Sequence, residues 1–236
     1  MGGFFRLIIL GLFLVILFEG GSILRSIQVS KELTRATRGY ANNDKNPLGR
    51  SMLVLGDSTA LGVGASRPEE SVAGRLADTR AITYTENYAK AGATAADIKE
   101  QMTRAERSHY DYILVQVGAN DIIRFHSAMQ AKAELEPVFK AILSSSDRAY
   151  FMFAGDMGAV PLFWWPLSSV YHQATLRYRD ELHALAESVG ITYVDLYDPP
   201  GYSVFSKEPD VYFAKDHFHP SSAGYAVWFE KLMGSL

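Results

Sequence analysis

The sequence predicts an α/β fold: a flavodoxin-like three-layer α/β/α sandwich with a five-stranded parallel sheet, preceded by an N-terminal hydrophobic helix. From Ser51 onward, short apolar segments alternate with longer amphipathic ones. The short segments are nearly continuous runs of apolar residues, which is typical of parallel strands covered on both faces. The stretch Phe4–Phe18 is apolar except for Arg6, which favours a separate helix ahead of the domain.

The composition is that of a folded protein with a substantial core. Of the 236 residues, 48% are hydrophobic and 21% are charged. The formal net charge is −3 and no run of Lys and Arg occurs, so we expect no nucleic-acid partner. Cysteine is absent, which excludes disulfides, thiol nucleophiles and cysteine-ligated zinc.

Three interpretations compete for residues 1–24. At 1.5 Å per residue, Phe4–Phe18 would extend roughly 22 Å, short of the ~30 Å hydrocarbon core of a bilayer. A signal peptide fits Arg6, the apolar run and the small residues Gly20 and Ser22. An uncleaved membrane anchor fits the hydrophobicity and the lack of alanine at a cleavage site, and a buried core helix is the third interpretation. We favour the anchor.

Residues 25–50 are interpreted as a linker, because TRGYANNDKNPLGR at 37–50 is polar and carries Gly, Asn and Pro. Residues 51–236 form the predicted domain. Apolar runs predict its strands at Met52–Leu55, Ile82–Tyr88, Tyr112–Val117, Ala149–Ala154 and Ile191–Leu196.

Amphipathic segments predict the helices between these strands, at Pro68–Asp78, Thr94–Arg107, within Ser127–Leu143, Ser169–Val189 and Ser221–Met233. Ser66 is the expected N-cap ahead of Pro68, and Thr94 with Asp97 fits a capping box. Gly190 is expected to end the long helix.

Small turns carrying polar side chains follow three of the predicted strands. Ser58 lies in Gly56-Asp57-Ser58-Thr59 after the first strand, Gly92 follows the second, and Asn120 lies in Gly118-Ala119-Asn120-Asp121 after the third. Ligands of such sheets bind beyond the carboxyl ends of the strands. Taken singly, each turn is also compatible with an ordinary helix cap or loop.

A fourth motif, Asp216-His217-Phe218-His219-Pro220, precedes the last predicted helix. An Asp and a His three residues apart in a turn can face the same cleft. A capping loop is one alternative, and a metal site of Asp216, His217 and His219 is another. No further cluster of ligand residues lies nearby in the sequence, so we expect no metal.

Together, the series GDS … Gly … GxND … DxxH resembles that of the SGNH (GDSL-like) hydrolase family, from Met52 to the C-terminus. The resemblance implies a serine esterase in which Ser58 is the nucleophile, His219 the base and Asp216 the residue that orients the base. It also implies an oxyanion hole made of the backbone N–H groups of Ser58 and Gly92 and the side-chain amide of Asn120. No cofactor is implied. Thr59 departs from the leucine of the GDSL motif, and Gly92 is assigned by spacing and context.

Several substrates fit this resemblance. The first expectation is a small-molecule or lipid ester: a small acyl ester, a lysophospholipid or a thioester. O-acetyl groups on cell-envelope carbohydrate, and acyl transfer to a sugar or lipid hydroxyl, are alternatives. A catalytically dead, membrane-tethered binding module is a fourth, against which the intact Ser58, Asn120, Asp216 and His219 argue.

The apolar segment Val160–Leu167 contains Trp164 and Trp165. Packing on the domain's own core is one interpretation of this segment. The others are an acyl-binding wall or a contact with the bilayer surface, and we interpret the two tryptophans as substrate-binding residues.

The expected location is at a membrane. Arg6 favours an N-terminus in the cytoplasm, whereas the basic residues after the segment favour a domain in the cytoplasm: Arg25, Lys31, Arg35 and Arg38. We expect an extracytoplasmic catalytic domain, periplasmic or at the cell surface, because N-terminally tethered hydrolases are commonly exported. Cleavage of the segment would give a secreted protein.

Overall fold

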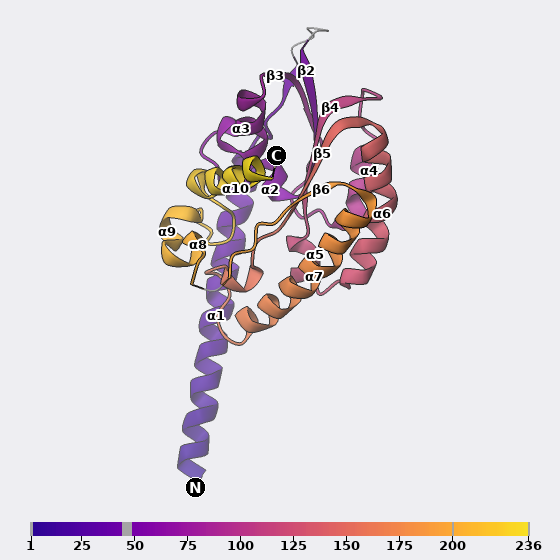
Figure 1. Ribbon diagram of the computed structural model, residues 1–236. Helices are drawn as coiled ribbons and strands as arrows, with labels where there is room; N and C mark the ends of the chain where they lie inside the picture. The colour runs from indigo at the N-terminus through magenta and orange to yellow at the C-terminus, as the bar shows by residue number, and fades with distance from the viewer. Residues whose placement is uncertain (1, 44–48, 200, 236) are drawn as a thin grey trace.

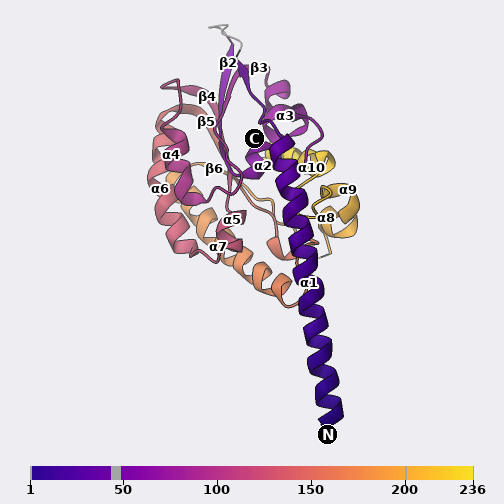
Figure 2. The same cartoon turned by 180° about the vertical axis from the view of Figure 1, so that it is seen from behind.

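The computed structural model describes residues 2–43, 49–199 and 201–235. A twisted sheet lies between two layers of helices, and one long helix runs along the domain and projects beyond it (Figures 1 and 2). Within the described residues the sheet has six strands in the order β1-β3-β2-β4-β5-β6. Their bounds are β1 Asn42–Asn43, β2 Arg50–Gly56, β3 Ile82–Asn87, β4 Tyr110–Val117, β5 Ser146–Phe153 and β6 Thr192–Val194.

The five strands from β2 to β6 are parallel and have the flavodoxin-like order that the sequence predicts. The prediction of a purely parallel, five-stranded sheet is wrong, because β1 adds an antiparallel edge strand that pairs Asn42 with Thr85. A strand of two exposed asparagines has no apolar pattern, so nothing distinguished it from the predicted linker.

Alternate residues of β2 face opposite sides of the sheet, as the pleat of a strand requires. Leu53 and Leu55 belong to the core cluster beneath helices α4 (Ile98–Met102), α6 (Ala128–Ser144) and α7 (Leu167–Val189). Met52 and Val54 belong to the cluster beneath α3 (Val72–Thr79) and α10 (Ser222–Gly234). A strand buried on both faces explains the uninterrupted apolar run at Met52–Leu55.

Two predicted helices are divided or shortened. The segment from Pro68 forms the 3₁₀ turn η1 (Pro68–Glu70), and α3 then begins after Ser71, which caps it by accepting from the Gly74 N–H. The predicted N-cap at Ser66 is therefore wrong. The capping box of Thr94 and Asp97 is confirmed, but it starts the 3₁₀ turn η2 (Ala95–Asp97), and α4 ends at Met102.

Within the part of the chain that the structure describes, five further short helices lie in the loops. The sequence patterns did not predict them, because each is too short to show periodicity. They are α2 (Ser58–Leu61), α5 (Ala119–Ile123), η3 (Met157–Ala159), α8 (Val204–Lys207) and α9 (Pro209–Tyr212). Both α2 and α5 start at the carboxyl ends of strands, where the candidate residues lie.

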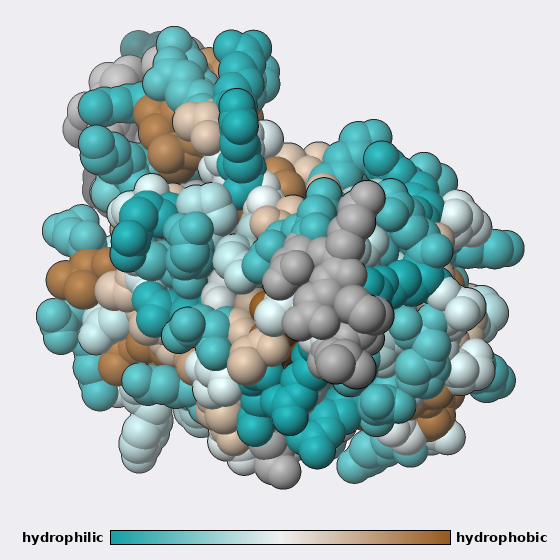
Figure 3. All heavy atoms as spheres, turned by 90° about the horizontal axis from the view of Figure 1, so that it is seen from above, coloured by the Kyte–Doolittle hydropathy of each residue, from teal (hydrophilic) through white to brown (hydrophobic). Residues whose placement is uncertain are grey.

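The face seen from above in Figure 3 is mainly hydrophilic, with scattered hydrophobic side chains.

Helix α1 runs from Gly2 to Ala36, so it continues into the first part of the segment interpreted as a linker. Ile23, Ser26 and Ser30 are buried or half-buried, while Lys31 and Arg35 are exposed, so one side of its C-terminal half faces the domain. Among the described residues, no helix combines the length and the apolarity needed to cross a membrane. The side chains of residues 1–5 and 7–19 lie outside the described ones, and the expected anchor or signal segment gains no support from this structure.

Candidate active site

Ser58 lies in the turn that connects β2 to α2, and the conformation of Gly56 makes this turn possible. Gly56 has φ of 140°, and a Cβ there would lie 2.0 Å from the backbone oxygen of Gln116. Asp57 caps α2 by accepting hydrogen bonds from the Thr59 N–H at 2.8 Å and the Thr59 hydroxyl at 2.7 Å. These bonds give Asp57 a role in shaping the loop, and they give Thr59 a structural role.

Gln101 holds the same turn from α4, and the sequence analysis missed it. Its side-chain oxygen accepts from the Gly56 N–H at 2.7 Å, and its side-chain nitrogen donates to the Gly56 carbonyl at 2.9 Å. The residue is buried. The sequence does place a glutamine at a core-facing position of the predicted helix. Because a buried amide needs polar partners, that position indicates hydrogen bonds of this kind.

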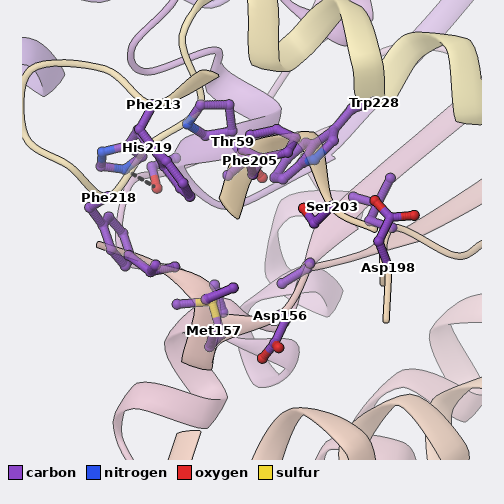
Figure 4. Close-up of a pocket in the computed structure, with 18 of the residues that line it drawn as sticks. Thr59, Asp156, Met157, Asp198, Ser203, Phe205, Phe213, Phe218, His219 and Trp228 are labelled. Atoms are coloured by element: carbon purple, nitrogen blue, oxygen red, sulfur yellow. Dashed lines mark hydrogen bonds between the residues drawn. The ribbon is translucent and has the colours of Figure 1, made fainter. Parts of the chain in front are cut away.

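His219 brings Ser58 and Asp216 together in a chain of hydrogen bonds. Figure 4 shows the His219 side chain at the edge of the pocket described below. Its Nε2 lies 2.9 Å from Ser58 Oγ, and its Nδ1 lies 2.5 Å from Asp216 Oδ2. The other oxygen of Asp216 accepts from the N–H groups of Phe218 and His219 at 3.1 and 3.0 Å. All three side chains are buried, so the structure brings these three predicted residues together in a place screened from bulk water.

The two carboxylates beside Ser58 have opposite pKa shifts. Burial raises the pKa of Asp216, but the hydrogen bonds and the charge of His219 outweigh burial and leave it lowered. Burial raises the pKa of Asp57 to about 6, against the opposing effect of its bonds from Thr59. Asp216 is therefore held as an anion that can stabilise a protonated His219, whereas Asp57 is readily protonated.

The loop that carries His219 packs against Gly64, a second position that the sequence analysis did not select. Gly64 has φ of 97°, and a Cβ there would lie 2.3 Å from the Pro220 oxygen and 3.2 Å from His219 Cβ. The Ala214 N–H donates to the His219 carbonyl at 2.8 Å. Two glycines, Gly62 and Gly64, follow helix α2 in the sequence. Such a pair indicates that another segment can approach the backbone closely at this point.

The predicted oxyanion-hole residues lie on neighbouring loops. Asn120 lies in the first turn of α5 and donates its side-chain amide to the Ala93 carbonyl at 2.9 Å. Gly92 has φ of 82°, and its carbonyl accepts from Arg124 Nη2 at 2.8 Å. The Asp121 carboxylate accepts from the Ala95 N–H at 3.0 Å, which links the two loops and supports a loop-shaping role for Asp121.

A pocket opens beside Ser58, Asn120 and His219, and Figure 4 shows His219 among the side chains that surround it. Eleven of the nineteen residues around it are apolar: Ala119, Ala154, Met157, Ala159, Val160, Leu196, Phe205, Phe213, Phe218, Pro220 and Trp228. The carboxylates of Asp156 and Asp198 also line it. They come from the loops after β4, β5 and β6 and from the C-terminal region. The pocket can accept an apolar group attached to an atom held at Ser58.

Trp164 and Trp165 lie apart from this pocket, in the loop before α7. Their exposed fractions are 52% and 71%, and neither lines the pocket. Met157 and Val160, from the same connection, line it instead. His217 is exposed on the loop between Asp216 and His219 and also does not line the pocket.

Residues 54–227 match the model of the GDSL-like Lipase/Acylhydrolase family. The chain belongs to this family. The resemblance inferred from the motif series is thereby confirmed. Helix α1 lies outside the matched residues.

Known relatives of this GDSL-like protein are distant. A GDSL-like esterase of Mycobacterium tuberculosis is 24% identical over 200 residues, which are 80% of this chain and 62% of that protein. The chain thus spans less than two thirds of the length of this relative.

Solved structures share the fold at low sequence identity. Phospholipase A1 from Streptomyces albidoflavus has a TM-score of 0.62 at 15% identity, covering 80% of this chain and 100% of that chain. The acetylxylan esterase Axe2 from Geobacillus stearothermophilus has a TM-score of 0.57 at 18% identity, covering 79% and 94%.

Proposed function

We propose that this protein hydrolyses carboxylic esters through a triad of Ser58, His219 and Asp216 and an acyl-enzyme intermediate. The observation that carries the proposal is the buried hydrogen-bond chain from Ser58 Oγ through the His219 ring to Asp216, at the edge of an apolar pocket. Serine needs such a base, because its hydroxyl is a poor nucleophile while it holds its proton.

In the first half of the reaction, Ser58 Oγ bonds to the ester carbonyl carbon and its proton passes to His219 Nε2. The carbonyl oxygen becomes an oxyanion, which accepts hydrogen bonds from the backbone N–H groups of Ser58 and Gly92 and the amide of Asn120. The bond to the alcohol oxygen then breaks, and the alcohol leaves with the proton from His219. Asp216 stabilises the positive charge that His219 carries between these steps.

In the second half, His219 takes a proton from a water molecule, whose oxygen attacks the acyl carbon. The bond to Ser58 Oγ breaks, Ser58 regains its proton from His219, and the free carboxylic acid leaves. The aromatic and aliphatic side chains around the pocket favour an acyl chain longer than acetyl, because each buried methylene contributes about 0.8 kcal/mol.

We also propose an extracytoplasmic, membrane-associated location. The apolar sequence of Phe4–Phe18 supports it. Cell fractionation followed by protease treatment of intact cells tests it: recovery in the soluble cytoplasmic fraction, protected from protease, would contradict it.

The test of the activity uses the full chain, its Ser58→Ala variant and p-nitrophenyl esters from acetyl to palmitoyl. We expect turnover by the unaltered protein, loss of turnover in Ser58→Ala, and labelling by a fluorophosphonate at Ser58. An Ser58→Ala protein as active as the original would refute the assignment of the nucleophile. The chain-length profile distinguishes an acetylesterase from an esterase of longer acyl chains.

A further inference from the structure

Helix α1 contacts the candidate active site directly, although it lies outside the residues that match the family. Ser26 is buried and donates its hydroxyl to the backbone carbonyl of Asp216. Ile23 packs against the core cluster that Phe163 and Phe218 also contact. The C-terminal half of α1 is thus anchored to the loop that carries Asp216 and His219, and Figures 1 and 2 both show it lying along the domain.

A groove runs between α1 and the domain, and we call it the α1 groove. Helix α1 contributes Ile27, Lys31 and Arg35 to its wall. The domain contributes Gly92, Asn120 and Phe218. The groove therefore contains two of the three proposed oxyanion donors, and α1 forms the wall opposite them.

Asn120 and Phe218 line both the α1 groove and the apolar pocket beside Ser58. The acyl chain and the alcohol group of an ester extend in different directions from the carbonyl carbon. When the carbonyl oxygen accepts from Asn120, these two parts lie on opposite sides of Asn120. The apolar pocket fits the acyl part. The α1 groove then receives the alcohol part.

The charges of the groove indicate which alcohol fits. Lys31 and Arg35 are four residues apart on α1, one helical turn, and both line the groove. Arg124 lies behind Gly92, bonded to its carbonyl. Among the described residues that line the groove, none is an Asp or a Glu. An anionic group in this groove therefore meets two cations of α1.

We propose that the α1 groove binds the alcohol part of the ester and that Lys31 and Arg35 select an alcohol carrying a phosphate group. This inference rests on the proposed ester hydrolysis. It assigns the choice of alcohol to a helix that the family domain does not include.

The experiment compares two esters with the same acyl group: butanoyl glycerol and butanoyl glycerol 3-phosphate. The full chain should have the higher kcat/KM for the phosphorylated ester. In Lys31→Gln/Arg35→Gln the ratio of the two kcat/KM values should fall about tenfold, since two partly solvated ion pairs are lost. Both residues are exposed, so the double variant should fold normally. Arg25→Gln is the matched control, because Arg25 is exposed on α1 but does not line the groove, and its ratio should stay unchanged.

Equal ratios in the original protein and the double variant would overturn the inference, and so would a preference of the full chain for the neutral ester. Binding of each ester to Ser58→Ala, measured by calorimetry, separates this proposal from the proposed activity. If Ser58→Ala binds the phosphorylated ester more tightly, and the added Lys31→Gln and Arg35→Gln changes remove that difference, the groove assignment stands even without turnover. Equal binding of both esters would refute it even if both are hydrolysed.

Discussion

Ser58 Oγ lies 2.9 Å from His219 Nε2, although the two residues are 161 positions apart in the chain. They meet because one follows the central strand β2 and the other precedes the last helix, α10. Both thus reach the carboxyl ends of the strands. Their contact carries the first prediction.

Asp216→Asn should lower kcat about 10⁴-fold, as loss of the anion does in serine triads, because asparagine cannot stabilise a protonated His219. The double variant Ser58→Ala/Asp216→Asn should have a kcat close to that of Ser58→Ala alone, because the residues of a triad act as a unit. Steady-state kinetics on one p-nitrophenyl ester checks both expectations.

His109→Asn provides a control for this experiment. His109 Nε2 lies 2.9 Å from Asp147 Oδ1 in another His–Asp pair, and neither residue lines the pocket beside Ser58. A loss of kcat in His109→Asn as large as in Asp216→Asn would contradict the assignment.

Asn120→Ala should lower kcat about 10²- to 10³-fold, the usual effect of removing one oxyanion donor. KM should change less, because the donor interacts most strongly with the charge that develops in the transition state. A change confined to KM would indicate that Asn120 only positions the substrate. Circular dichroism of the variant checks that the bond to Ala93 was not required for folding.

Gln101→Leu should lower the free energy of unfolding by about 1–3 kcal/mol, because it leaves the buried Gly56 N–H without this acceptor. The Gly56 carbonyl still accepts from the Lys90 N–H at 3.0 Å. Urea denaturation measures the change. Gln130→Leu on α6 is the control, since Gln130 is exposed and its replacement should alter the unfolding midpoint little. Equal effects of the two substitutions would contradict a specific role for Gln101.

The pKa of Asp57 predicts how stability depends on pH. Burial raises it from 3.8 in the unfolded chain to about 6, so the folded protein binds more protons than the unfolded chain between these values. The contribution of Asp57 to the free energy of unfolding therefore increases as pH falls from 7 to 4, by about 3 kcal/mol at most.

Asp57→Asn should abolish this part of the pH dependence, because asparagine does not titrate but retains an oxygen for the bonds from Thr59. The measurement is the difference in unfolding free energy between the original protein and the variant, taken at several pH values. A difference that does not change between pH 4 and pH 7 would refute the raised pKa.

Ala154→Leu should narrow the apolar pocket, because Ala154 lines it and leucine adds three carbon atoms. We expect kcat/KM for long acyl esters to fall at least tenfold and that for acetyl esters to change little. Trp165→Ala is the control, since Trp165 is exposed outside the pocket and should leave the chain-length profile unchanged. A profile that changes in Trp165→Ala but not in Ala154→Leu would restore the sequence-based interpretation of the tryptophans.

The parallel sheet and the positions of Ser58, Asn120 and His219 were predictable from the sequence for one physical reason. Buried strands such as Met52–Leu55 have an unmistakable apolar pattern, and the polar turns that follow them must meet at one edge of the sheet. The β1 edge strand was not predictable, because backbone pairing of Asn42 with Thr85 leaves no mark on side-chain polarity.

The contacts that hold the site were less predictable than its reactive side chains. The bonds of Gln101 to Gly56 join residues 45 positions apart, and that distance becomes short only in the folded chain. Ser26 is a comparable case, because its position on α1 gave no sign that the helix reaches Asp216. The aromatic residues Trp164 and Trp165 suggested a substrate-binding wall, but both are exposed outside the pocket. Packing decides the direction in which an apolar loop points, and the composition of the loop does not reveal it.

The position of α1 also matters for choosing the protein with which to search for substrates. A shortened protein that begins after Ala36 would keep every residue matched by the family, so reactive small esters could still be cleaved. It would lose one wall of the α1 groove and the hydrogen bond from Ser26. A library of esters screened against such a protein would then be ranked by a groove that lacks its α1 wall. The natural ester would be cleaved weakly and could be missed.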